Sequence, residues 1–323
     1  MHDGEGRCVE LGQVAEQMSD RPGLNMTRSK IEAFAEDGFV VVEQILAPDE
    51  VELIKGRYEK LFRGEFETSL VPDELNWLQG RDAEDRTRQI CNGWKSDRYI
   101  ADVVLRPEIG RACATLGGWP GARLSQDNLI WKPSGGKPLG FHQDSSYERW
   151  CIPSDWVSCW IALDDTTAHG GTVEYVRGSH RWEESGMIRQ FHAPDDPHED
   201  LKVAAQRAGV NRLDLVPIEV PAGAGVFHSG WTWHGSDVNR SDRPRRALVA
   251  HCMSSEARFH PSFVGYIYSR YKRFGDDIMD ETHFPIIWRE DGYCSPFIGP
   301  YRRREISWGA TQYAGPDTPS GAS

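Results

Sequence analysis

The sequence lacks the features that mark secreted, membrane-spanning and nucleic-acid-binding proteins. Its 323 residues contain no apolar run near the roughly 18 residues that a membrane-spanning helix needs. The N-terminus, MHDGEGRCVELG, has no basic region followed by an apolar stretch, so we expect no signal peptide. Basic residues number 37 against 49 acidic ones. The resulting charge of −12 argues against a nucleic-acid partner or an anionic membrane surface.

Cysteine is scarce, and its spacing carries no motif. The seven cysteines are scattered along the chain and form no CxxC pair. This pattern argues against a disulfide framework or a zinc ribbon and favours idle thiols in a reducing cytoplasm. With 39% hydrophobic and 27% charged residues, the composition is that of an ordinary globular protein. We therefore expect a cytoplasmic protein with a small-molecule partner, and the sequence leaves monomer and homodimer open.

Three parts follow one another along the chain. Residues 1–26 are interpreted as a polar leader, and the small polar residues of 309–323 predict a disordered tail. Residues 27–308 are expected to form a single domain. Within it, the charged stretch 181–213 interrupts a series of apolar runs. Long insertions of this kind are often lids or binding loops, and a solvated surface excursion is the alternative.

Helical patterns come first in the chain and strand patterns later. Ile31, Phe34 and Ala35 lie at helical spacing before Gly38, and Pro48 opens a second apolar stripe. Short strands are predicted over 39–42, 124–131, 139–144, 156–163, 172–176, 215–219, 224–228 and 245–253. This order predicts an α+β, mainly β fold, a sandwich or barrel with N-terminal helices packed against one sheet.

The most informative motif is Gly140-Phe141-His142-Gln143-Asp144, at the end of an expected strand. Residues two apart on a strand point to the same face, so His142 and Asp144 converge while Gln143 points away. Joined by a second imidazole, they would form the 2-His-1-carboxylate set that binds Fe(II) on one face. His198 and Asp200 have the same spacing, but they lie in an Asp- and Pro-rich loop and are expected to face solvent.

Residues 225–236 offer two candidates for the third ligand, His228 and His234. Arginines follow at positions 243, 245 and 246. Because arginine grips a carboxylate with two parallel hydrogen bonds, one of them could hold the far end of a dicarboxylic co-substrate. Arg245 shares its strand face with Ala247 and Val249, which are small enough to leave room for a ligand.

Taken in order, these motifs resemble the phytanoyl-CoA dioxygenase family of Fe(II)/2-oxoglutarate enzymes. Residues 31–42 match the family's opening helix and strand, and FHQD matches its HxD motif. Residues 160–180 match its W-x-ALDD…GG-T…GSH run. Residues 234–245 match its HGS…N-x-S…P-R run, and the similarity covers about Thr27 to Met253. Arg177 departs from the family's usual proline. The family's co-substrate arginine typically follows the distal histidine by eleven residues, a spacing that selects His234 and Arg245.

The resemblance implies a double-stranded β-helix, or jelly roll, that uses Fe(II), 2-oxoglutarate and O₂. The site residues that it implies are His142, Asp144 and His234 as iron ligands, and Arg245, Ser236, Trp160 and Gln143 as co-substrate contacts. Two residues near the motifs, Gln126 and Trp231, are the candidate substrate contacts. The remaining histidines near the motifs, His180, His228 and His251, lack a carboxylate at i+2 or the spaced arginine and are interpreted as structural.

The reaction that the resemblance implies is hydroxylation of an unactivated C–H bond in a small molecule, such as a secondary-metabolite intermediate, with release of succinate and CO₂. Asp144 favours this outcome, because related halogenases lack the carboxylate. Two alternatives stay open. One is desaturation, epimerisation or ring closure with the same cofactors, and the other is a catalytically silent barrel that only binds its ligand.

Overall fold

The computed structural model describes residues 24–263, 267–303 and 305. The proposed leader is therefore described only from Leu24, and the tail expected over 309–323 lies outside the described residues. Within the described part of the chain, no helix has the length and apolar character needed to cross a membrane.

Both helices that the sequence predicts near the N-terminus are present. Helix α2 spans Arg28–Asp37 and leads through Gly38 into strand β1, Phe39–Val42, and helix α3 spans Pro48–Phe62. Gly38 ends α2 in the left-handed conformation, with φ of 85°. A Cβ atom at this position would also lie 2.5 Å from the His180 ring. Glycine is thus required here both by the backbone conformation and by the close packing.

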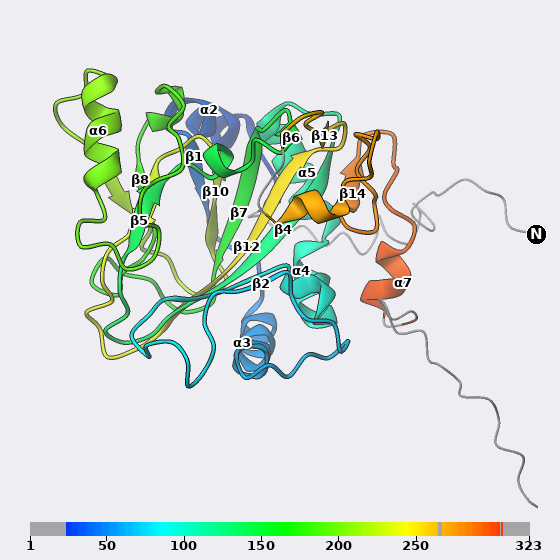
Figure 1. Cartoon of the computed structure of the whole chain (residues 1–323), viewed down its shortest axis with the longest axis horizontal. Helices are drawn as coiled ribbons and strands as arrows, with labels where there is room; N and C mark the ends of the chain where they lie inside the picture. Colours follow the sequence, from blue (N-terminus) through cyan, green and yellow to red (C-terminus); the bar gives the residue numbers. More distant parts are fainter. Residues whose placement is uncertain (1–23, 264–266, 304, 306–323) are drawn as a thin grey trace, which may run out of the picture.

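Two antiparallel sheets form the body of the fold (Figure 1). The order of strands in the larger sheet is β1-β10-β7-β12-β4-β3-β2, with β14 beside β4. Its further strands are β2 (Glu74–Leu75), β3 (Arg88–Cys91), β4 (Gly121–Lys132), β7 (Trp156–Ala162), β10 (Gly225–Ser229), β12 (Arg245–Ser254) and β14 (Ile286–Arg289). The smaller sheet has the order β5-β11-β8-β9, with β5 (Leu139–His142), β11 (His234–Ser236), β8 (Glu174–Val176) and β9 (Leu215–Pro217).

Alternation along the larger sheet separates two apolar layers. In β12, Leu248 and Ala250 belong to the main core, which also holds residues of helices α4, Arg98–Val104, and α5, Pro107–Gly117. Ala247 and Val249 face the other way and pack with Tyr175 of the smaller sheet. The helices therefore cover the outer face of the larger sheet, and the two sheets enclose an interior between them. This arrangement confirms the predicted mainly β fold with helices against one sheet.

The C-terminal part, which the sequence left unassigned, packs against the strand region of the fold. Strand β14 pairs with β4, and β13 (Arg258–Phe259) pairs with β6 (Cys151–Ile152). A separate aromatic cluster joins Trp150 and Trp156 to Tyr268 and Phe284. The short helices α6 (Glu199–Arg207), α7 (Ile298–Arg302) and η3 (Asp144–Tyr147) complete the elements used below.

Cysteine follows the expectation at most described positions. Five thiols are free and buried: Cys91, Cys113, Cys151, Cys159 and Cys252. Cys294 is disulfide-bonded, which corrects the expectation of an idle thiol at that residue.

Candidate metal centre

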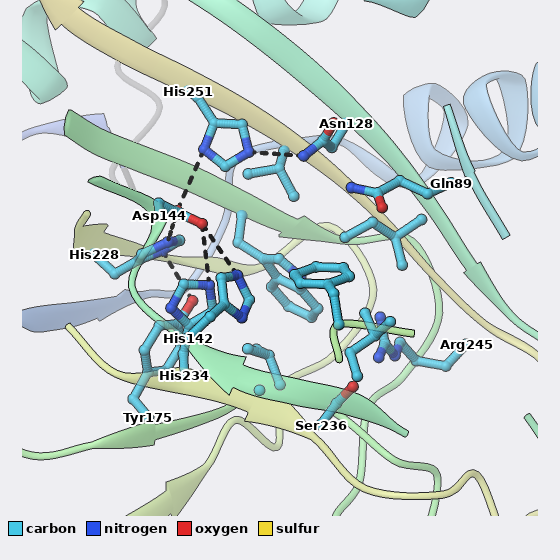
Figure 2. A pocket seen from close by; sticks show the side chains of 17 residues that line it. Gln89, Asn128, His142, Asp144, Tyr175, His228, His234, Ser236, Arg245 and His251 are labelled. Carbon is cyan, nitrogen blue, oxygen red and sulfur yellow. Dashed lines mark hydrogen bonds and ion pairs between the residues drawn. The ribbon is translucent and has the colours of Figure 1, made fainter. Parts of the chain in front are cut away.

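Three side chains converge between the two sheets. His142 ends β5 and His234 begins β11, and the two residues are register partners in the smaller sheet. The expected strand 139–144 stops at His142, and Asp144 instead opens η3. Gln143 between them stays extended, with φ of −113° and ψ of 124°, so Asp144 still turns toward the histidine. The Oδ1 atom of Asp144 lies 3.3 Å from His142 Nε2 and 3.5 Å from His234 Nε2 (Figure 2).

Backbone carbonyls fix both rings in the orientation that a metal requires. His142 Nδ1 lies 2.9 Å from the Gly140 carbonyl, and His234 Nδ1 lies 2.9 Å from the Thr232 carbonyl. Because a carbonyl only accepts, each Nδ1 carries the proton and each Nε2 keeps a free lone pair toward Asp144. Such partners behind the ligands set both the tautomer and the ring orientation in metal sites.

The second oxygen of Asp144 is held by a different set of side chains. His228 Nε2 lies 3.1 Å from Oδ2, and the Ser158 hydroxyl donates to the same oxygen at 3.2 Å. The other ring nitrogen of His228 lies 2.9 Å from the Tyr175 hydroxyl. Both nitrogens of His228 are therefore engaged, which supports His234 rather than His228 as the second imidazole ligand. His228 acts instead as a support for the carboxylate.

His251 extends this support away from the centre. The Asn128 amide lies 3.1 Å from His251 Nε2, and His251 Nδ1 lies 2.7 Å from the Ser158 oxygen. Because the amide nitrogen can only donate, Nδ1 of His251 carries the proton and passes a hydrogen bond to Ser158. Burial lowers the pKa of His251 to about 4, so its ring is neutral. The sequence predicted no role at the centre for His251, which reaches Asp144 through this chain.

The donor set fits a divalent transition metal. One ligand atom from each of His142, Asp144 and His234 lies within 4.8 Å of the others. Burial by itself raises the pKa of Asp144, but the neighbouring imidazoles, His234 first, hold it well below its usual value. Burial also lowers the pKa of His234. One carboxylate and two imidazoles on one side of a cavity form the facial set that Fe(II) sites use.

A small cavity of about 60 Å³ extends from the three ligands toward Arg245. Its apolar walls include Trp160, Val173 and Val249. Arg245 is buried, and its guanidinium donates only to the Gly171 carbonyl, at 2.8 and 3.3 Å. Burial lowers the pKa of Arg245 to about 10. No carboxylate of the described residues lies within ion-pair distance, so this cation is placed to receive an anionic ligand.

Ser236 lines the same cavity, and a buried lysine supports it. Lys132 is fully buried and donates to the Ser236 oxygen at 2.7 Å and to the Asp237 carbonyl. Because that oxygen already accepts from Lys132, its own hydrogen remains free to donate toward a ligand. Lys132 lies opposite Arg245 in the pairing of β4 and β12. Burial, followed by the charge of Arg245, holds the pKa of Lys132 well below its usual range.

A larger cavity of about 670 Å³ meets the small one at the ligands. The two share the lining residues Gln89, Asn128, His142, Asp144 and Phe191. Gln126, predicted as a substrate contact, lines the larger cavity and accepts a hydrogen bond from the Tyr268 hydroxyl. Part of the predicted insertion also reaches it, through Gly186, Met187 and His192.

Two predicted contacts lie elsewhere. Gln143 is buried away from both cavities, donating to the Trp231 carbonyl at 2.7 Å and accepting from the Ser185 amide at 2.9 Å. Its polar ends are thus already satisfied by the backbone. Trp231 also lines neither cavity, and its ring nitrogen donates to Asp155. The structure therefore places neither of these two predicted contacts on the wall of either cavity.

The remaining histidines lie outside the centre. His180 lies 3.1 Å from the Ala35 carbonyl, in keeping with a structural role. His198 does not simply face solvent as expected, because its half-buried ring stacks on Phe141 with centroids 4.5 Å apart. It precedes α6 on the outer side of the smaller sheet and takes no part in the metal set.

Comparison with known proteins identifies relatives of this chain by sequence and by fold. Ectoine dioxygenase of Nocardia farcinica is 27% identical over 74% of this chain and 82% of its own length. Peroxisomal phytanoyl-CoA dioxygenase of Rattus norvegicus is 24% identical over 70% and 68%. The non-heme alpha ketoglutarate dependent carbocyclase SnoK from nogalamycin biosynthesis shares the fold, with a TM-score of 0.63 and 24% identity over 81% of this chain and 96% of that one.

EctD from S. alaskensis, solved with 2-oxoglutarate and 5-hydroxyectoine, also shares the fold, with a TM-score of 0.57 and 20% identity over 74% and 80%. The family model described as phytanoyl-CoA dioxygenase (PhyH) matches residues 34–247. Because that match spans more than half of the chain, this protein belongs to the phytanoyl-CoA dioxygenase family.

Proposed function

We propose that this protein is a non-haem Fe(II)/2-oxoglutarate-dependent oxygenase that hydroxylates a C–H bond of a small molecule, releasing succinate and CO₂. The main support for the proposal is that His142, Asp144 and His234 line one small cavity together with Arg245. Arg245 is buried and has no ion pair among the described residues. Bound iron would supply the activation of O₂ and the oxidising power, which no side chain provides.

The protein's own residues would bind and orient the reactants. His142, Asp144 and His234 would hold the metal, and Arg245 with Ser236 would hold the far carboxylate of 2-oxoglutarate. The chelating end of the co-substrate would then lie where the two cavities meet. Apolar side chains line the space toward Arg245 and exclude water, which strengthens the carboxylate–guanidinium attraction.

Hydroxylation is proposed over halogenation and over a purely binding role on specific grounds. Asp144 supplies a protein ligand at the position that a halogenase leaves to chloride, so halogen transfer is not favoured. A purely binding role would not need three converging metal donors. Epimerisation and ring closure, which appear among the activities of structurally similar proteins, use the same ligand set and are distinguished only by the product.

The test is metal-dependent turnover of 2-oxoglutarate. The wild-type protein, purified without metal, should bind 2-oxoglutarate in calorimetry only after Mn(II) or Fe(II) is added. With Fe(II) and O₂ it should form succinate, at a rate that a true substrate raises. Mass spectrometry of the product should then show the addition of one oxygen atom. Metal-independent 2-oxoglutarate binding, or no succinate under any of these conditions, would overturn the proposal.

A further inference from the structure

The larger cavity has acidic and aromatic walls. Three carboxyl groups line it, from Glu74, Asp144 and Glu148, and no lysine is among its lining residues. Arg149 is its one arginine, and that guanidinium already pairs with Glu184. Burial is the main cause that lowers the pKa of His192 to about 4, so this lining imidazole is neutral near pH 7. Carboxyl groups therefore outnumber free cations in the described lining.

Glu148 is the most unusual of these acids. Its side chain is only 6% exposed and follows η3 directly, four residues after Asp144. The carboxyl group accepts a hydrogen bond from the Trp150 ring nitrogen. Among the residues that the structure describes, no Lys, Arg or His nitrogen lies within ion-pair distance of it. Burial, with a smaller contribution from Asp144, raises the pKa of Glu148 well above its usual value.

A buried carboxyl group without a cation resists ionisation, which is why burial raises the pKa of Glu148. A cation brought next to it would favour the ionised form, and buried carboxylates in proteins are commonly paired in this way. Neither the core nor the metal centre makes use of Glu148, because it contacts none of the three metal ligands through a side-chain hydrogen bond. Its position on the cavity wall indicates that its partner is brought by the ligand.

Aromatic rings surround this acidic wall. Trp150 and Tyr268 pack with ring centroids 5.1 Å apart, and both line the cavity with Trp156. The Tyr268 hydroxyl is engaged by Gln126, so its contribution to a ligand is its ring. Aromatic faces attract cations through the negative potential of the ring face. A carboxylate within aromatic walls is the combination that proteins use to bind protonated and quaternary amines.

We propose that the substrate carries a basic nitrogen that is protonated when bound, and that Glu148 pairs with it in the larger cavity. This inference rests on the proposed function, because it assigns the substrate class of that same site. A cavity of about 670 Å³ suits a drug-sized molecule. The same walls would repel the phosphate groups of a coenzyme A thioester, for which the described lining offers no free cation.

The experiment compares 2-phenylethylamine with the nearly isosteric but uncharged 2-phenylethanol. Calorimetry on wild-type protein loaded with Mn(II) and 2-oxoglutarate should show at least tenfold tighter binding of the amine. Glu148→Gln keeps the shape and an acceptor for Trp150 but removes the charge, so the preference should fall to about twofold or less. Glu183→Gln, the control, neutralises an exposed carboxylate that lines neither cavity and should keep the wild-type preference.

Each other outcome has a definite meaning. Equal binding of the two probes by wild type, no binding of the amine, or a preference that survives in Glu148→Gln would each overturn the inference. A thermal melt of each variant confirms that it is folded. A separate titration of 2-oxoglutarate into the Mn(II)-loaded protein reports co-substrate binding, and its failure together with an intact amine preference would overturn the proposed function instead. In that case the protein would be a cation-binding barrel.

Discussion

The two cavities that meet at the metal centre are built in different ways. The walls of the smaller one come mainly from strands of both sheets, including Trp160 of β7 and Val249 of β12. Much of the larger one comes from connecting segments, such as those carrying Arg149, Met187 and Phe263. Strands hold side chains in fixed register, whereas loops vary without disturbing the sheets. The co-substrate end is therefore rigid, and the substrate end is free to differ among relatives.

The charges of the two cavities are also opposite. The smaller one ends at buried Arg245 with Lys132 behind it, and the larger one carries Glu74 and Glu148. Asp144 and the imidazoles lie between them. A dianionic co-substrate and a cationic substrate would each be attracted to one side and repelled from the other. Such a division gives specificity through repulsion as well as attraction.

The largest expected effect concerns the metal centre, which lies where the two cavities meet. His234→Ala should abolish Mn(II) binding, because it removes one of three ligands. His228→Ala should keep the metal site but weaken it by about 10–100-fold, since His228 only supports Asp144. Calorimetry gives both affinities. As a second readout, added Mn(II) should raise the melting temperature of wild type and of His228→Ala but not of His234→Ala. The reverse pattern would mean that His228 is the ligand.

The different construction of the two cavities explains how much of each can be predicted from the sequence. His142 and Asp144 were predictable, because their convergence depends only on extended backbone at one intervening residue. The sequence by itself left His228 and His234 open, and only the family's spacing chose between them. The structure supports that choice through the partners of each ring nitrogen, which no local pattern contains. Strand alternation separated Arg245 from Arg246, and the family's spacing from His234 selected Arg245.

Other features depend on contacts that are distant in the sequence. From the sequence, Lys132 would be expected at the surface, because its sequence neighbours give no sign that its amine is buried. Its partner Ser236 lies 104 positions later in the chain. Gln126 and Tyr268 are 142 positions apart. Strand β3, with the sequence RQIC, has too little apolar alternation to be predicted and is fixed by pairing with β4. The sequence did not single out Glu148, because what distinguishes this residue is its surroundings in the fold, where no cationic side chain of the described residues pairs with it.

The next prediction separates the two cavities by function. Arg245→Ala should weaken 2-oxoglutarate binding by two or more orders of magnitude, because removing one partner of a buried charge pair costs about 3–5 kcal/mol. Arg243→Ala is the control, since that side chain is 88% exposed. Calorimetry on Mn(II)-loaded protein measures both. Binding of 2-phenylethylamine should stay within about threefold of wild type in Arg245→Ala. Equal losses at both arginines would indicate a diffuse basic surface instead.

The insertion 181–213 was predicted as a lid, and the structure divides it into two parts. Residues near Phe191 lie along β5, where the Gly140 amide donates to the Phe191 carbonyl at 2.9 Å. Helix α6 packs instead on the outer side of the smaller sheet, where Leu201 is buried with Phe141 and Trp233. Only the first part borders the centre, so replacing the whole segment would disturb the ligand strand as well.

The smallest expected effect tests this division with two single substitutions. The Phe191 ring packs edge-on against His142, with centroids 4.7 Å apart, and lines both cavities. Phe191→Ala should admit water to the centre and raise substrate-independent succinate formation several-fold, because shielding of the site is lost. Leu201→Ala should leave that rate unchanged while lowering the free energy of unfolding by about 2–5 kcal/mol. Succinate assays without substrate, with urea unfolding of both variants, provide the measurements. If Leu201→Ala uncouples the reaction as strongly as Phe191→Ala, α6 takes part in closing the site.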